Sequence, residues 1–245
     1  MGDNRTVFAS ARSILVINPN SNTQMTLALR PVVDALGFEG TRYTFFTAPD
    51  GPSSINNEDD AEESTRHALP ALEPLLSKHD GFLVACFSAH PLVPALKKHA
   101  EAGGAGKPVT GIMEASTAAA LQLTGVGKRW GVVTTGKVWE EVLTEGIGRF
   151  VGARPGNFVG VESTGLSAGE LHDRSPEEVR RRMGEATARL LDRGGVEVVV
   201  LGCAGMAGLG EIVREVAGGR GERVRVVDGV QAGVGWVEGA VRAGW

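Results

Sequence analysis

Two short apolar segments each end in a cysteine, and these two residues are the only cysteines of the chain. One segment covers residues 81–86 (Gly-Phe-Leu-Val-Ala-Cys) and the other covers residues 198–203 (Val-Val-Val-Leu-Gly-Cys). Each is too short for a helix and leads into small or polar residues, a pattern typical of a buried parallel strand. The sequence therefore predicts an α/β fold in which Cys86 and Cys203 lie at strand ends, where open parallel sheets bind their ligands.

The rest of the chain continues this alternation of strands and helices. Apolar or β-branched segments bounded by turn residues predict further strands at residues 13–18, 41–48, 109–114, 130–135, 157–162 and 224–228. Helical patterns lie between them, and one of them begins with Ser175 as a cap and Pro176 in the first turn. A loop at residues 49–57 is rich in Pro, Gly, Ser and Asn, and it is placed to fold over a site.

The two halves of the chain have similar spacings. Three pairs of predicted strand-end residues keep nearly one separation: Cys86 and Cys203 (117 positions), Asn18 and Thr134 (116), and Glu114 and Asp228 (114). This favours a duplicated unit over the chance spacing of a regular βα chain. The expected organisation is one lobe from residues 13–115 with part of the C-terminal region, a second lobe from residues 116–230, and a flexible tail at residues 1–12.

Composition limits the partners of the protein. The formal net charge of -4 provides no basic surface, so nucleic acid and anionic membranes are not expected partners. No apolar segment approaches the roughly 18 residues of a membrane span. The first twelve residues lack a secretory pattern, so free thiols in a reducing cytoplasm are expected.

Two interpretations of the cysteines follow from the residues alone. Free cysteines are often inert core residues. Here, however, one thiol ends a strand in each half, beside the expected start of a helix, and N–H groups at a helix start lower a thiol pKa. This favours a catalytic pair with lowered pKa values; a disulfide switch would instead need Cα atoms within about 7 Å.

Other predicted strands also end in candidate site residues: Asn18 and Asn20, Met113 and Glu114, and Thr134 and Thr135. The asparagines and threonines either cap turns or offer neutral donors and acceptors that suit a substrate with amide groups. Glu114 and Asp228 are predicted to be structural. His90 either starts a helix or tunes the thiol of Cys86.

No cofactor or metal is expected. The five histidines show no metal-ligand spacing and join no cysteine cluster. Neither a Gly-x-Gly-x-x-Gly fingerprint after a strand nor a Gly-Lys-Ser/Thr phosphate loop is present.

Four stretches together resemble the aspartate/glutamate/hydantoin racemase superfamily, and within it most closely the hydantoin and allantoin racemase branch. They are residues 14–22 (Ile-Leu-Val-Ile-Asn-Pro-Asn-Ser-Asn), 85–88 (Ala-Cys-Phe-Ser), 111–115 (Gly-Ile-Met-Glu-Ala) and 202–205 (Gly-Cys-Ala-Gly). The resemblance runs over about residues 14–236. It implies two similar Rossmann-like lobes with parallel sheets related by a pseudo-twofold duplication, an active site in the cleft between them, and a homo-oligomer acting on a small molecule.

The resemblance also implies cofactor-independent racemisation by Cys86 and Cys203. The substrate contacts expected around this catalytic pair are Asn18, Asn20, Phe87, Ser88, Met113, Thr134, Thr135, Gly202, Ala204 and Gly205. One departure concerns the substrate: bacterial hydantoin racemases commonly have an Asp shortly after the first cysteine, where this chain has Ala89.

The expected reaction inverts a carbon next to a carbonyl, as in a 5-substituted hydantoin or allantoin. One thiolate removes the proton from one face, and the opposite thiol supplies a proton to the other face. Backbone N–H groups after the two cysteines would stabilise the developing oxyanion. Alternatives are a maleate isomerase-like enzyme with a covalent cysteine, a malonate decarboxylase-like enzyme, and a non-catalytic binder of a small nitrogenous metabolite.

Overall fold

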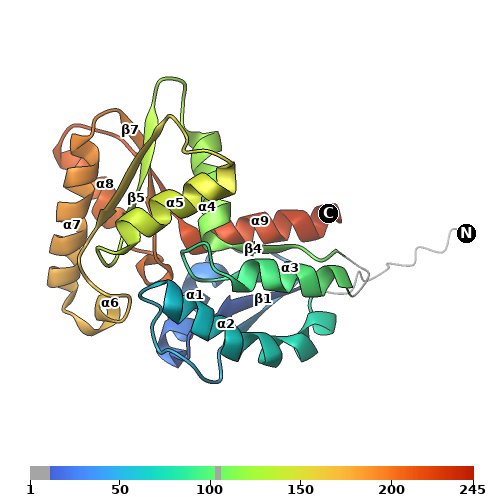
Figure 1. The fold of residues 1–245 in the computed structure, drawn as a ribbon. Coiled ribbons are helices and arrows are strands. Elements are labelled where there is room, and N and C mark those ends of the chain that lie inside the picture. The colour runs from blue at the N-terminus through green and yellow to red at the C-terminus, as the bar shows by residue number, and fades with distance from the viewer. Residues whose placement is uncertain (1–11, 103–105) are drawn as a thin grey trace, which may run out of the picture.

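The computed structural model describes residues 12–102 and 106–245 (Figure 1). Of the expected tail, residues 1–11 lie outside the described residues, and Arg12 is the first residue of a strand. The strands are β1 (Arg12–Asn18), β2 (Thr41–Thr47), β3 (Gly81–Val84), β4 (Val109–Gly111), β5 (Arg129–Thr134), β6 (Phe158–Ser163), β7 (Val196–Leu201) and β8 (Arg225–Asp228).

Helices connect these strands. They are α1 (Thr23–Asp34), α2 (Glu58–Leu72), α3 (Leu92–Ala102), α4 (Ile112–Leu123), α5 (Trp139–Val151), α6 (Glu170–Asp173), α7 (Pro176–Asp192), α8 (Gly210–Gly219) and α9 (Gly229–Ala243). Two short 3-10 helices, η1 (Glu73–Lys78) and η2 (Ala204–Met206), complete the described elements. The expected cap of α7 is present, because the Ser175 side chain accepts a hydrogen bond from the backbone N–H of Glu178.

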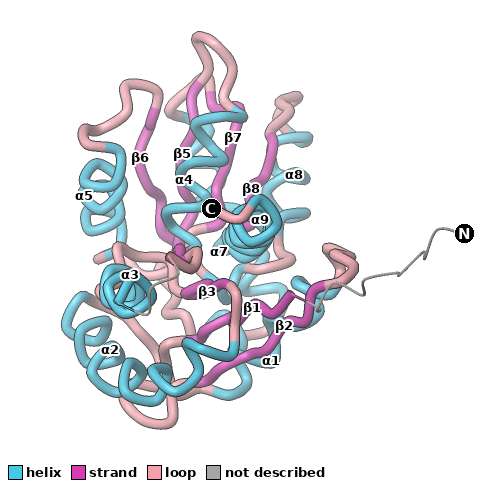
Figure 2. Tube along the Cα trace, turned by 90° about the vertical axis from the view of Figure 1, so that its right-hand side faces the viewer, coloured by secondary structure: helices cyan, strands magenta, loops and turns pink. Residues whose placement is uncertain are grey.

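The strands form two four-stranded sheets in which every pair is parallel. The strand order is β2-β1-β3-β4 in the first sheet and β6-β5-β7-β8 in the second, so the second sheet repeats the topology of the first. Figure 2 shows the second sheet above the first. The predicted fold of two similar Rossmann-like α/β lobes is therefore confirmed.

The sheet centres are fully buried. In β1 the residues from Ile14 to Ile17 have no exposed surface, and in β7 the same holds from Val198 to Leu201. Such continuous apolar strands are expected where helices cover both faces of a parallel sheet. Burial on both faces therefore explains why these strands are short, continuous apolar segments in the sequence.

One predicted boundary is wrong. Residues 109–114 were expected to form a strand, but β4 ends at Gly111 and α4 begins at Ile112. The apolar pair Ile112 and Met113 fits a buried helix face as well as a buried strand, so periodicity does not separate the two. Glu114 consequently lies in the first turn of α4 and not at a strand end.

The two helices that follow the last strand of each sheet hold the lobes together. Helix α4 contacts β7 and β8 of the second sheet, whereas α9 contacts β1, β3 and β4 of the first, and α4 and α9 pack against each other. A Cβ atom on Gly233 of α9 would lie 2.5 Å from Leu83 Cδ1, so the glycine permits this close approach to β3. The completely buried carboxylate of Glu238 on α9 accepts hydrogen bonds from Thr41 and Tyr43 of β2.

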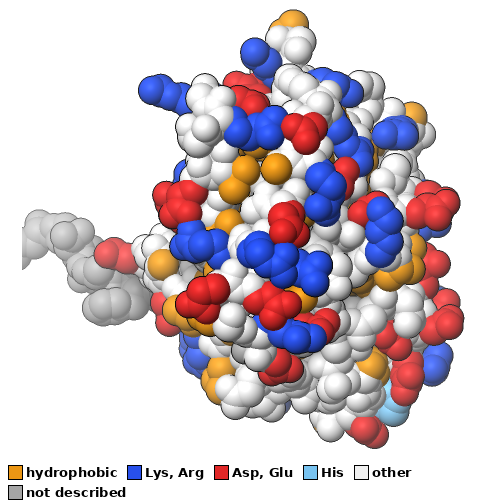
Figure 3. Space-filling model, turned by 90° about the vertical axis from the view of Figure 1, so that its left-hand side faces the viewer, with side chains coloured by type: hydrophobic (Ala, Val, Ile, Leu, Met, Phe, Trp, Pro, Cys, Tyr) orange, Lys and Arg blue, Asp and Glu red, His pale blue; other side chains and the backbone are white. Residues whose placement is uncertain are grey.

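The outer face of the second lobe is covered by α7 and α8, and there Lys and Arg side chains alternate with Asp and Glu (Figure 3). Many of these charges pair with one another, as Arg180 of α7 does with Glu215 of α8. Within the described residues, no helix is both long enough and apolar enough to cross a membrane.

Candidate active site

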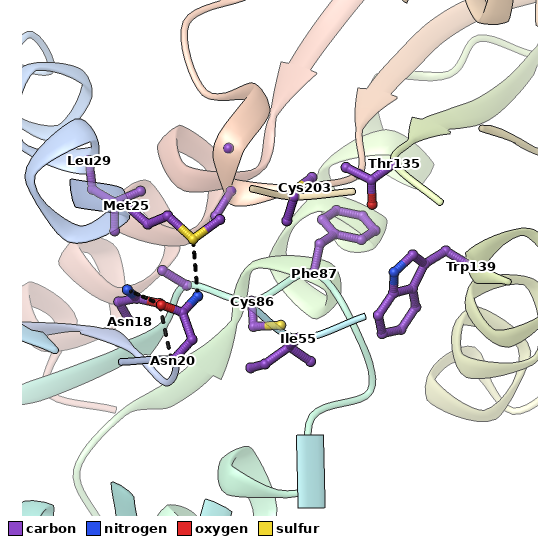
Figure 4. A pocket seen from close by; sticks show the side chains of 15 residues that line it. Asn18, Asn20, Met25, Leu29, Ile55, Cys86, Phe87, Thr135, Trp139 and Cys203 are labelled. Carbon is purple, nitrogen blue, oxygen red and sulfur yellow. Dashed lines mark hydrogen bonds between the residues drawn. The ribbon is translucent and has the colours of Figure 1, made fainter. Parts of the chain in front are cut away.

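A cavity lies between the two lobes, next to the carboxyl ends of β1, β3, β5 and β7 (Figure 4). Both cysteines line it, Cys86 from the first lobe and Cys203 from the second. Its volume is about 50 Å³. The other lining residues are Asn18, Asn20, Met25, Leu29, Ile55, Ala85, Phe87, Thr135, Trp139, Ala168, Gly202, Ala204 and Gly205.

Cys86 lies two residues beyond the end of β3, in a turn closed by a hydrogen bond from Ser88 N–H to the Cys86 carbonyl at 3.2 Å. Its Sγ is 3.6 Å from the hydroxyl of Ser88. The Ser88 hydroxyl therefore contacts the thiol, and Ser88 lines a second, adjoining cavity. Ser88, which was expected to contact substrate, is absent from the lining of the cavity that contains the cysteines.

Cys203 lies two residues beyond the end of β7 and immediately before η2. A Cβ atom on the preceding Gly202 would lie 2.5 Å from Val132 Cγ1 and 3.1 Å from the carbonyl of Val133, so only glycine fits there. The backbone N–H groups of Gly205 and Met206 are directed at the Cys203 thiol. Peptide dipoles at this position favour a negative charge on sulfur.

Burial raises the pKa of both thiols. Desolvation is the largest cause in each case and takes the pKa of Cys86 to about 12 and that of Cys203 to about 11, from an ordinary value of 9.0. Hydrogen bonds from Ser88 and from the η2 backbone lower these pKa values, but by less than burial raises them. The expectation of lowered thiol pKa values is therefore wrong for this cavity: although both cysteines keep some exposed surface, desolvation between the lobes outweighs the nearby N–H groups.

The two predicted asparagines have different environments. Asn18 Nδ2 donates to Asn20 Oδ1 at 2.8 Å, to the Asn22 carbonyl and to Thr26 Oγ1, and Asn18 Oδ1 accepts from Asn20 N–H. Asn18 therefore organises the loop between β1 and α1. The amide nitrogen of Asn20 donates only to the sulfur of Met25, at 3.3 Å, within the described part of the chain. Since a thioether is a weak acceptor, this amide is available to a better one (Figure 4).

The two predicted threonines also differ. Thr134 is buried, and its hydroxyl donates to the Gly202 carbonyl at 2.7 Å, which ties β5 to the strand end beside Cys203. Thr135 lines the cavity, and its hydroxyl points toward the interior of the cavity in Figure 4. Thr134 thus supports the loop, while Thr135 presents a hydroxyl to the cavity.

Four more of the expected contacts line the cavity: Phe87, Gly202, Ala204 and Gly205. Met113 does not. It is almost completely buried, and its sulfur packs near Gly146 of α5. The boundary error at β4 explains the difference, because a residue inside α4 faces the core and not a sheet edge.

Two polar residues whose roles the sequence left open, Asp228 and His90, make contacts that stabilise helix starts. Asp228 caps α9 through the N–H groups of Val230 and Gln231. His90 accepts a hydrogen bond from Leu92 N–H at the start of α3 and contacts Ser64 Oγ at 3.1 Å. Burial lowers the pKa of His90 to about 4, which leaves a neutral ring.

Glu114 lies near Cys86, and its charge raises the pKa of that thiol. Burial raises the pKa of Glu114 itself. Its Oε2 atom is buried and has no hydrogen-bond partner among the described residues. Glu114 is not among the residues that line the cavity.

Sequence reasoning missed several apolar lining residues: Met25, Leu29, Ile55, Ala85, Trp139 and Ala168. Ile55 belongs to the Pro- and Gly-rich loop that was expected to fold over a site, and it does line the cavity. Trp139 begins the helix after the Thr134-Thr135 loop, so an aromatic residue close behind a strand end was an available signal. The others come from helix faces and loops whose direction is set by packing.

Within the part of the chain that the structure describes, no lysine, arginine, histidine, aspartate or glutamate lines this cavity. Its polar groups are amides, a hydroxyl, two thiols and the backbone. Among the described residues, no three His, Cys, Asp or Glu side chains form a group that fits a metal ion.

The sequence matches the Asp/Glu/Hydantoin racemase family over residues 14–236. An uncharacterized protein of Schizosaccharomyces pombe is 36% identical over 230 residues, which are 94% of this chain and 92% of that protein. A hydantoin racemase from Pseudomonas sp. is 27% identical over 232 residues, 94% of this chain and 86% of that protein. The structure of an allantoin racemase from Klebsiella pneumoniae is similar with a TM-score of 0.81 at 27% identity, covering 95% of this chain and 89% of that one. The chain therefore belongs to the Asp/Glu/hydantoin racemase family, and it resembles the hydantoin and allantoin racemases within it.

Proposed function

We propose that this protein is a cofactor-independent racemase of a neutral cyclic amide, such as a 5-substituted hydantoin or allantoin, and that Cys86 and Cys203 transfer the proton. One observation carries the proposal. A cavity between the lobes is lined by one thiol from each lobe and by no charged side chain.

The chemistry needs two acid–base groups on opposite faces of one carbon. A C–H bond beside a carbonyl is weakly acidic, and its conjugate base is a planar enolate. A thiolate on one face removes the proton, and the thiol on the other face returns one, so the carbon is inverted. After one turnover the roles of the two sulfurs are exchanged.

We assign the first thiolate to Cys203. The surroundings of the two sulfurs give the reason. Two backbone N–H groups point at the Cys203 sulfur, whereas Cys86 has one hydroxyl and a nearby Glu114 carboxylate that disfavours a second negative charge.

The reacting ring of the substrate is neutral in this proposal because the described residues that line the cavity offer no cation to a carboxylate. A buried carboxylate without a partner is costly, so free aspartate, glutamate, maleate and malonate fit poorly. A cyclic amide needs only neutral donors and acceptors, and the amide of Asn20 and the hydroxyl of Thr135 supply them. This is the reason for preferring the racemase to the maleate isomerase-like and malonate decarboxylase-like alternatives.

Polarimetry on enantiopure substrates tests the proposal. The panel is enantiopure 5-substituted hydantoins, allantoin, aspartate and glutamate, with achiral maleate followed separately by mass spectrometry, and with Cys86→Ser and Cys203→Ser as variants. We expect the wild-type protein to abolish the optical rotation of the hydantoins or of allantoin. Both variants should leave the rotation unchanged. Turnover of maleate with a cysteine adduct detected by mass spectrometry would favour the isomerase, and a raised melting temperature without any loss of rotation would favour a binding protein.

A further inference from the structure

A second cavity adjoins the one that contains the cysteines. Trp139 lines both cavities, and Ser88, whose hydroxyl contacts the Cys86 sulfur, lines the second. The second cavity has a volume of about 210 Å³, compared with about 50 Å³ for the first. Helices α2 and α5 and the loop after Cys86 form its walls.

The proposed intermediate defines a direction toward this second cavity. When the reacting carbon is planar, its ring bonds and its substituent lie in one plane, with the substituent pointing away from the ring. In the proposed mechanism the thiols occupy the two faces of this plane. In Figure 4 Asn20 lies on one side of the two cysteines and Trp139 on the opposite side.

A ring whose amides bind Asn20 therefore directs its substituent toward Trp139. The small volume of the first cavity leaves little room for both a ring and a large substituent. The second cavity begins at this same tryptophan.

The lining of the second cavity indicates what the substituent contains. Its walls are apolar, with Ala61 from α2, Val142 from α5 and Ala89 from the loop after Cys86. Within the described part of the chain, its ionisable lining residues are two exposed carboxylates, Glu58 and Glu62. Glu58 already has a partner, since Arg149 lies 3.7 Å away, whereas no ion pair to Glu62 occurs among the described residues.

We infer, on the basis of the racemase function proposed above, that the second cavity is the binding site for the substituent of the reacting carbon. The substituent that fits has an apolar stem of several carbons, which packs against Trp139 and Val142. Its far end carries a hydrogen-bond donor or a positive charge that faces Glu62. The substrate class is thus a cyclic amide with a long, donor-terminated side chain.

Substitutions that change the volume of the second cavity test whether it binds the apolar stem of the substituent. Val142→Phe reduces its volume and Val142→Ala enlarges it, while Val151→Phe makes the same kind of change on an exposed part of the same helix, away from both cavities. The readout is the ratio of kcat/KM for 5-pentylhydantoin to that for 5-methylhydantoin. We expect Val142→Phe to lower this ratio about tenfold or more, as loss of room for a few methylene groups does in other enzymes. Val142→Ala should hold or raise the ratio, and Val151→Phe should leave it unchanged.

A second substrate pair tests the charged end. Hydantoins with a 5-(4-aminobutyl) or a 5-pentyl substituent differ mainly in their terminal group. We expect the wild-type protein to prefer the amine, and Glu62→Gln to reduce this preference about threefold, as expected for an exposed ion pair. The reduction should shrink at high salt, because exposed charges are screened.

These experiments separate the two proposals. If the wild-type protein racemises neither these hydantoins nor allantoin, the racemase function itself is contradicted. If the hydantoins are racemised but Val142→Phe and Val151→Phe give the same ratio as the wild type, the substituent site is wrong and the racemase function stands. An unchanged amine preference in Glu62→Gln would overturn the assignment of the charged end.

Discussion

The burial of both thiols predicts how racemisation depends on pH. The pKa of Cys203 is about 11 and that of Cys86 about 12. A raised pKa means that the thiolate forms only at higher pH. At about pH 7 roughly one Cys203 side chain in ten thousand is ionised, since each unit below the pKa reduces the thiolate tenfold.

The rate should follow this small population. Because the reaction begins with a thiolate, kcat/KM should rise about tenfold for each pH unit between about pH 7 and about pH 9, with no plateau in that range. Ser88→Ala removes a hydrogen bond that lowers the pKa of Cys86. Because a less acidic Cys86 thiol is a poorer proton donor to the enolate, this variant should lower the rate in the neutral range further without changing the slope.

The assay is initial loss of optical rotation at each pH, with the rate without enzyme subtracted. The Cys86→Ser/Cys203→Ser double variant provides the control for any protein effect that does not involve the thiols. A rate that is independent of pH between about 6 and about 9 would refute the reasoning. It would mean that one thiol is ionised at neutral pH and that desolvation does not dominate its pKa.

Three substitutions in the loops around the cavity have separate expected effects. Gly202→Ala places a Cβ atom 2.5 Å from Val132 Cγ1, so overpacking of about 1–3 kcal/mol should lower the melting temperature by several degrees and displace Cys203, measured by thermal unfolding and polarimetry. Gly136→Ala is the matched control, because its Cβ would meet no atom closer than 3.8 Å, and a drop of equal size there would contradict the steric argument. Asn18→Ala should lower the free energy of unfolding by about 1–3 kcal/mol, because it leaves loop groups without partners. Asn20→Asp should instead lower kcat/KM about tenfold, since it removes the free amide donor; an effect on stability alone would argue against a substrate contact.

The sequence was most informative where a pattern had only one physical explanation. The apolar segments before Cys86 and Cys203 are too short for helices and are followed by turn residues, so they predict buried strands. The ends of these strands mark the site. The separation of 117 positions between the two cysteines reflects two sheets with one topology. The cleft and its two thiols follow from these features.

Other properties depend on packing and were not accessible from the sequence. The segment from Ile112 to Glu114 has a pattern that suits a strand or a helix, and only contacts with α9 and the second sheet decide for the helix. The thiol pKa values depend on how much water reaches each sulfur. The difference between Thr134 and Thr135 could not be assigned without side-chain directions.

The central claim is that each cysteine serves one face of the substrate. Proton exchange in deuterium oxide tests this claim most directly. Cys86→Ser retains only the Cys203 thiol, and Cys203→Ser retains only the Cys86 thiol. Each enantiomer of a racemised hydantoin is incubated with each variant, and deuterium at the reacting carbon is followed by NMR or mass spectrometry.

The predicted result is reciprocal. One variant should exchange the proton of one enantiomer without inverting it, and the other variant should exchange only the opposite enantiomer. Equal exchange of both enantiomers by either variant would contradict the assignment of one face to each thiol. Full racemisation by either variant would contradict the two-cysteine mechanism.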